Sequence, residues 1–165
     1  GTKGQWVTNT FSNTCNPALN AQRNNKKAFD ESVETAQKSI VEFKHDLVIG
    51  SSFGGAVAIQ LLNDKIWSGP TILLAPAHMF YGQNGILPQN TRAIIIHSPS
   101  DRIVPYAHAL SLLSCGGMGL ELWNASTNFS RNPDDQHDGN HRLHDIISNG
   151  MLWRACSSLL NEISK

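Results

Sequence analysis

The sequence predicts an α/β protein, a three-layer sandwich in which helices cover both faces of a mostly parallel central sheet. Short apolar runs rich in β-branched residues alternate along the chain with longer segments of helical periodicity. The run AIIIH at 93–97 is apolar on both faces, which is typical of a central strand in a parallel sheet. Strands that alternate with helices in this way indicate parallel βαβ units.

The length and continuity of the chain favour a single domain. It has 165 residues, 40% of them hydrophobic, which suits one core of ordinary size. Neither an internal repeat nor a linker of biased composition divides the sequence. We therefore expect residues 1–165 to form one domain.

The first part of the chain is expected to place one long helix before the first buried strand. Residues 1–27 are polar, with a short strand expected at 5–8. Between 28 and 43, apolar residues recur at helical spacing with charges between them, which predicts an amphipathic helix. A strand is expected at 46–49, followed by a largely buried helix at 54–66.

The remaining elements continue the alternation. They are expected as a strand at 71–75, a loop at 78–90, a strand at 93–97, a helix at 105–113, a strand at 120–123, a polar loop at 124–140 and a closing helix within 141–163. Pro76 ends the first of these strands. Pro105 stands in the first turn of the helix, where proline is accepted because its missing N–H would be unpaired anyway.

A serine stands among glycines directly after the strand expected at 46–49. The segment GSSFG (50–54) matches the pattern G-x-S-x-G with Ser52 at its centre, and a helix is expected to follow. Glycines permit a sharp strand-to-helix turn that exposes the serine hydroxyl. We therefore expect Ser52 to be a nucleophile and Ser51 a small spacer, against the alternative of a plain tight turn.

Further side chains with catalytic chemistry follow later strands. Asp101 comes shortly after the strand at 93–97, where an isolated aspartate could also cap a helix or form an Asx turn. The segment HDGNHRLHD (137–145) follows the last expected strand and carries His137, His141 and His144. Because ligands of such sheets sit at the carboxyl ends of the strands, a histidine here can take the proton of Ser52 while Asp101 fixes its tautomer. The chain order Ser, Asp, His predicts a catalytic triad.

Four blocks of sequence carry a further signal: VIGSSFGGAVA (48–58), LLAPA (73–77), IIIHSPSDRIVP (94–105) and GNHRL (139–143). In combination they resemble the α/β-hydrolase superfamily, in particular its small lidless serine esterases. The resemblance runs from about residue 28 to the end of the sequence. It implies a reduced α/β-hydrolase-like fold with Ser52 as nucleophile, Asp101 as the acid member and His141 as the base. His141 is favoured over His137 and His144 because Gly139-Asn140-His141 gives the G-x-H pattern of such enzymes.

The sequence departs from that superfamily in its shortened N-terminal part. Members usually begin with a strand and an HG-type loop, whose amide is one donor of the oxyanion hole, and no such motif precedes residue 50. The backbone amide of Phe53 supplies one donor; the second is unassigned, with the loop at 8–16 as the candidate. Losing one donor costs about 10²–10³ in rate. A catalytically weak or inactive hydrolase-fold protein that acts as a binding partner is therefore the alternative function.

Several other side chains have two interpretations. Met79, Phe80 and Tyr81 should lie near the nucleophile and form either an apolar acyl pocket or plain packing. His97 ends a central strand as either a hydrogen-bonded core histidine or a residue of the site. The histidines of 137–145 have spacings that suit a metal, but no HExxH or CxxC motif accompanies them. We interpret that segment as a solvated loop with one catalytic histidine and expect no metal site.

Composition narrows the classes of partner. Thirteen basic residues balance thirteen acidic ones, and no basic run indicates a nucleic-acid partner. The apolar stretches are too short to cross a bilayer. Three cysteines without a CxxC spacing favour a reducing compartment or at most one disulfide, so a cytoplasmic location is expected. Two sequons begin at Asn124 and Asn128 and would matter only in a secreted protein.

The function expected from the sequence is that of a serine hydrolase. Ser52, His141 and Asp101 are expected to cleave a carboxylic ester or thioester, a small-molecule acyl substrate, through an acyl-enzyme and without a metal or organic cofactor. Little sequence is left for a lid, so the site should be open and suit small or exposed acyl groups. Pairing of two copies into a homodimer through the front edge of the sheet is left open.

Overall fold

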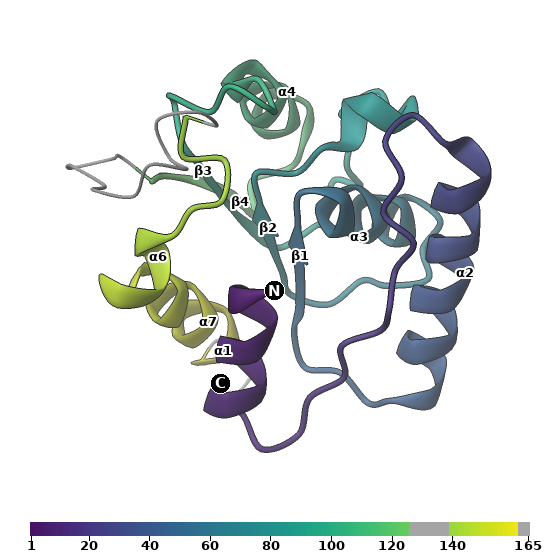
Figure 1. The fold of residues 1–165 in the computed structure, drawn as a ribbon, viewed down its shortest axis with the longest axis horizontal. Coiled ribbons are helices and arrows are strands. Elements are labelled where there is room, and N and C mark those ends of the chain that lie inside the picture. Colours follow the sequence, from purple (N-terminus) through teal and green to yellow (C-terminus); the bar gives the residue numbers. More distant parts are fainter. Residues whose placement is uncertain (126–138, 162–165) are drawn as a thin grey trace.

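A computed structural model describes residues 1–125 and 139–161 (Figure 1). Its centre is a four-stranded sheet in which neighbouring strands are parallel and follow one another in the order of the sequence. The strands are β1 (Val48–Ser51), β2 (Thr71–Leu74), β3 (Ala93–His97) and β4 (Leu120–Asn124). The predicted fold class, a three-layer α/β sandwich with a parallel sheet, is confirmed.

Helices lie on both sides of the sheet (Figure 1). They are α1 (Thr2–Thr10), α2 (Lys26–Glu42), α3 (Phe53–Asn63), the 3-10 helix η1 (His78–Tyr81), α4 (Tyr106–Cys115), α6 (Asp145–Ser148) and α7 (Met151–Asn161). Helices α1, α6 and α7 lie on one side, and α3 and α4 lie on the other. Helix α2 packs on α3, away from the sheet.

The core follows the alternation of side chains along the strands. Ile72, Leu74, Ile94 and Ile96 point to one face, where they pack against α6 and α7. Leu73 and Ile95 point to the other face and pack against α3 and α4. Because both faces are covered, β2 and β3 are buried at every position, as expected for central parallel strands. Ser52, Asp101 and His141 lie in the segments that follow the carboxyl ends of β1, β3 and β4.

The N-terminal segment differs from its prediction. The strand expected at 5–8 is wrong, because these residues belong to α1. Trp6 packs partly buried on the core beside the sheet, and its ring meets Phe11 edge to face at 6.1 Å between centroids. The β-branched and aromatic residues that favoured a strand are instead held in a helix by this tertiary packing.

The closing helix expected within 141–163 is divided. Helix α6 ends at Ser148 and α7 begins at Met151, with Asn149 and Gly150 between them. Gly150 has a φ of +73°, a left-handed conformation that glycine adopts without steric cost. In the part of the chain that the structure describes, none of the helices has the length and apolar character to cross a membrane.

Candidate active site

Ser52 occupies a sharp turn between β1 and α3. Its backbone has φ 50° and ψ −110°, a conformation that serine rarely adopts. The Ser52 amide donates to the Leu74 carbonyl at 2.8 Å, and the Ser52 carbonyl accepts from the Ala77 amide at 3.0 Å. Both partners belong to the end of β2 and the residues after it. The strand next to β1 therefore holds the turn in place.

The turn requires glycine at only one of the two glycine positions of the G-x-S-x-G pattern. It also requires glycine at position 55, just after the pattern. A Cβ on Gly50 would lie 2.5 Å from the carbonyl oxygen of Gly54, and one on Gly55 would lie 2.9 Å from Cα of Pro76. A Cβ on Gly54 would meet only a Leu19 methyl at 4.0 Å. The close backbone approach therefore requires glycine at 50 and 55, whereas position 54 has room for a side chain.

Asp101 follows β3 and is fully engaged by hydrogen-bond donors. Its Oδ1 accepts from the backbone amides of Ile103 and Val104, each at 2.8 Å. Its Oδ2 accepts from His141 Nδ1 at 2.8 Å and from His97 Nε2 at 3.0 Å. Both interpretations of this aspartate therefore describe part of it: one oxygen forms the Asx-type turn, and the other binds two imidazoles.

His141 stands at the end of a tightly constrained turn. Gly139 has a φ of +63°, and a Cβ there would lie 1.8 Å from the Ser100 carbonyl oxygen. The Ser100 hydroxyl in turn donates to the Gly139 carbonyl at 3.1 Å. Asn140, also at positive φ and buried, donates from its side chain to the Ala125 carbonyl at 3.4 Å. These contacts fix the histidine loop to the segment after β3 and to the end of β4.

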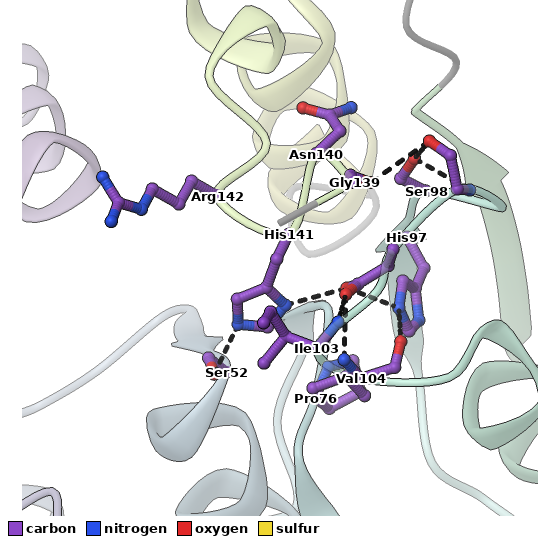
Figure 2. A network of polar contacts seen from close by, with 12 residues as sticks. Ser52, Pro76, His97, Ser98, Ile103, Val104, Gly139, Asn140, His141 and Arg142 are labelled. Atoms are coloured by element: carbon purple, nitrogen blue, oxygen red, sulfur yellow. Dashed lines mark hydrogen bonds and ion pairs between the residues drawn. The ribbon is translucent and has the colours of Figure 1, made fainter. Parts of the chain in front are cut away.

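The three predicted residues come together in a chain of hydrogen bonds (Figure 2). Ser52 Oγ lies 2.9 Å from His141 Nε2, and His141 Nδ1 lies 2.8 Å from Asp101 Oδ2. Since the carboxylate accepts, Nδ1 carries the proton and Nε2 is left to accept from the serine hydroxyl. Among the alternatives, His144 precedes α6 and His137 lies outside the described residues.

His97 is a member of this network that the sequence left undecided. It is completely buried at the end of β3, and its Nε2 contacts Asp101 Oδ2 and, at 3.1 Å, the Val104 carbonyl. Both contacts are acceptors, so Nε2 donates. Figure 2 shows His97 and His141 approaching the same carboxylate from two sides. The signal in the sequence was its spacing, four residues before Asp101 and at the last position of a strand.

The hydrogen bonds decide the charge of Asp101. Burial of its side chain would by itself raise the pKa of this carboxyl group. The donors from His141, His97 and the Val104 amide outweigh burial and hold the pKa well below its usual range. A carboxylate that stays ionised can fix the histidine tautomer and stabilise an imidazolium.

The residues expected to form the oxyanion hole and the acyl pocket belong to the start of α3 and to η1. Phe53 is the first residue of α3, so its amide is one of the helix N–H groups without an intrahelical partner. Met79, Phe80 and Tyr81 form most of η1. The Tyr81 ring meets Phe53 edge to face at 5.2 Å and stacks on Phe29 at 4.9 Å, whereas Phe80 contacts His108. A pocket at these three residues stays a prediction.

No group of three or more histidine, cysteine or acidic side chains that could hold a metal ion occurs within 1–125 and 139–161.

The chain has a reduced α/β-hydrolase-like fold. Its parallel sheet, covered by helices on both sides, is consistent with this fold. No protein family and no curated protein matches the sequence.

Solved structures share the general arrangement at low identity. The esterase domain of a Rhodothermus marinus protein is 14% identical, with a TM-score of 0.49, over 65% of this chain and 62% of that one. An α/β serine hydrolase homologue from Coxiella burnetii is 15% identical, with a TM-score of 0.48, over 65% and 52%. The α/β hydrolase MGS-M1, from a Medee basin deep-sea metagenome library, is 15% identical, with a TM-score of 0.48, over 82% and 64%. The chain thus spans less than two thirds of each of these proteins.

Proposed function

We propose that this protein is a serine hydrolase that cleaves a carboxylic ester or thioester through an acyl-enzyme. The observation that carries the proposal is the unbroken chain from Ser52 Oγ through His141 to Asp101, with contacts of 2.9 and 2.8 Å. Distances of this size are those required for proton transfer between a nucleophile, its base and the group that orients the base.

In the first half-reaction, Ser52 Oγ attacks the carbonyl carbon while His141 Nε2 takes the hydroxyl proton. The negative charge that develops on the carbonyl oxygen is stabilised by the Phe53 amide. The imidazolium is stabilised by the ionised Asp101. When the tetrahedral intermediate collapses, its bond to the leaving group breaks, His141 gives the proton to the departing alcohol or thiol, and the acyl group remains on Ser52.

In the second half-reaction, water replaces the leaving group. His141 Nε2 takes a proton from the water, whose oxygen attacks the acyl carbon. Collapse of the second tetrahedral intermediate releases the carboxylic acid and returns the proton to Ser52 Oγ. Nothing in these steps requires a cofactor, because the chain supplies nucleophile, base and one oxyanion donor.

A fluorophosphonate probe tests the proposal directly. We expect one probe to attach per chain of the wild type and none to attach to Ser52→Ala, as measured by intact-protein mass. Asp101→Asn should still fold but react on the order of 10⁴-fold more slowly, because the amide favours the wrong tautomer of His141. Ser51→Ala is the matched control, one residue away, and should label like the wild type.

The same experiment separates the alternative function. A folded wild type that neither reacts with the probe nor hydrolyses p-nitrophenyl esters would be a catalytically inactive hydrolase-fold protein, and the serine hydrolase proposal would then be wrong. Circular dichroism of each sample confirms that it is folded before its reactivity is interpreted.

A further inference from the structure

A cavity of about 520 Å³ runs along the free edge of β1. In the described sheet β1 is an edge strand, paired with β2 alone. Residues 11–21 pass on the far side of the cavity, and no backbone hydrogen bond joins them to β1. The space between this segment and the strand is therefore left open, and a volume of this size is within the roughly 300–1,000 Å³ of small-molecule sites.

The walls of the cavity are largely apolar and come from both layers of helices. Helix α1 and residues 11–21 line one part, α2 and α3 another, and β1 a third, with the side chains Val7, Phe11, Leu19, Ile40, Ile49 and Val57. The segment 11–21 is held at both ends. The Phe11 ring stacks on Trp153 at 6.1 Å between centroids, and the Asn20 amide donates to Ser32 Oγ at 3.0 Å.

One end of the cavity reaches the turn that carries Ser52. Phe53 and Gly54, the two residues after the serine, are part of its lining. Gly54 adds no side chain, and a Cβ there would have only the Leu19 methyl within 4 Å, at 4.0 Å. The cavity therefore reaches the residue whose amide is proposed to hold the oxyanion. Lys44 and Asp46, which precede β1, also line the cavity, and they lie at the opposite end of the strand from Ser52.

We propose that this cavity binds the alkyl chain of the substrate's acyl group, so that the preferred substrates are esters or thioesters of medium-chain fatty acids. The proposal rests on the serine hydrolase function above and names its substrate class. A flexible alkyl chain fits a long apolar space that reaches Phe53 and Gly54, the two residues after the nucleophile. Its transfer from water is favourable for every methylene buried. This differs from the small acyl groups expected from the sequence, because that expectation considered a lid over the site and not a space beside β1.

A series of p-nitrophenyl esters tests the proposal, from acetate through butyrate, hexanoate and octanoate to decanoate. We expect kcat/KM to rise about three- to fourfold for each methylene that the cavity accepts, as burial of CH₂ groups predicts, and then to level off. Equal values from acetate to decanoate, or a steady fall, would overturn the proposal while leaving the hydrolase function intact.

Two neighbouring residues of α2 provide a matched pair of variants. Ile40 lines the cavity, whereas Val41 is 76% exposed and does not. We expect Ile40→Trp to lower the octanoate-to-acetate ratio of kcat/KM at least tenfold, and Val41→Trp to leave it as in the wild type. If Ile40→Trp fails to fold, Leu19→Ala replaces it and should move the optimum toward longer chains. A folded Ile40→Trp or Leu19→Ala protein with an unchanged profile would contradict the proposal.

Measuring binding to a variant that cannot turn over substrate tests the cavity independently of the proposed hydrolysis. Decanoic acid should bind the Ser52→Ala protein in isothermal titration calorimetry, and Ile40→Trp should weaken that binding at least tenfold. Decanoate binding by a wild type that hydrolyses no ester would support the cavity and contradict the hydrolase function. Ester hydrolysis without decanoate binding and without chain-length preference would support the hydrolase function and contradict the proposed role of the cavity.

Discussion

His97 and His141 donate hydrogen bonds to the same oxygen atom, Oδ2 of Asp101, at 3.0 and 2.8 Å. His141 contacts Ser52, whereas His97 lies completely buried behind the carboxylate. The second imidazole therefore does not reach the nucleophile. It holds the carboxylate in the position from which the first imidazole is oriented, which makes His97 a positioning residue of the proposed triad.

Replacing His97 tests this role. A hydrogen bond to a charged group is worth about 1.5–3 kcal/mol, so we expect His97→Phe to lower kcat roughly tenfold or more with little change in KM. Loss of the donor should also raise the pKa of Asp101. His97→Gln keeps an amide donor and should recover part of kcat. Steady-state kinetics across a pH range measure both effects. If kcat and its pH dependence in His97→Phe matched the wild type, the role of His97 would be purely structural.

Two glycines in left-handed conformations differ in what surrounds them. Gly139 has φ +63°, and a Cβ there would lie 1.8 Å from the Ser100 carbonyl oxygen. Gly82 has φ +76°, and a Cβ there would have no neighbouring atom within 4 Å. Gly139→Ala must displace the loop that carries His141, and we expect kcat/KM to fall about 10²-fold, as for a misplacement of about 1 Å. Gly82→Ala should cost about 1–2 kcal/mol of stability and leave kinetics unchanged. Equal kinetics of the two variants would be evidence against the constraint on His141.

The glycines before and after Ser52 should also respond differently to alanine. At Gly50 a Cβ meets backbone at 2.5 Å, and we expect Gly50→Ala to lower the free energy of unfolding by about 3 kcal/mol or more. At Gly54, within α3, a Cβ has room, and Gly54→Ala should raise the free energy of unfolding by about 0.5–1 kcal/mol. Urea unfolding of both variants measures the difference. A destabilised Gly54→Ala would show that the motif needs both glycines.

His78 should make the fold sensitive to mild acid. Burial, together with the nearby His108 and His97, lowers the pKa of His78 from 6.5 to about 4, against the effect of its bond to the Pro76 carbonyl. The unfolded chain binds this proton more readily, so stability should fall from about pH 6.5 to pH 4, by roughly 3 kcal/mol in total.

His78→Asn isolates this effect, because its amide can still donate to the Pro76 carbonyl. Urea unfolding at several pH values should show a smaller loss of stability in the variant over that window. Asp101 acts at lower pH: its lowered pKa gives stability above about pH 4 that is lost as pH falls further. The same slope in the wild type and in His78→Asn would contradict the assignment to His78.

The sequence predicted the parts of the fold that depend on local pattern. The strand AIIIH was predicted at the residues where β3 lies, because a run that is apolar on both faces fits a covered sheet. Ser52, Asp101 and His141 could be named because each follows a strand, and the carboxyl ends of parallel strands meet. Their roles as catalytic residues stay predictions until they are measured.

Other features depend on tertiary contacts that no local pattern reports. The helical state of residues 5–8 depends on packing of Trp6 beside the sheet. The role of His97 depends on the return of the chain at Asp101, which turns the carboxylate back toward the strand end. The break between α6 and α7 is different, because it did have a local signal that the prediction of one closing helix overlooked: Asn149-Gly150, a pair typical of turns.

The backbone at Ser52 has a consequence for how this chain balances folding against chemistry. A non-glycine residue at φ 50° and ψ −110° is held in a sparsely populated region, which costs of the order of 1–3 kcal/mol. Glycine at this position would relieve that strain and remove the hydroxyl in the same step. The most stable form of this protein and its proposed active form therefore differ at residue 52, and a screen for thermostability alone would select variants that have lost the nucleophile.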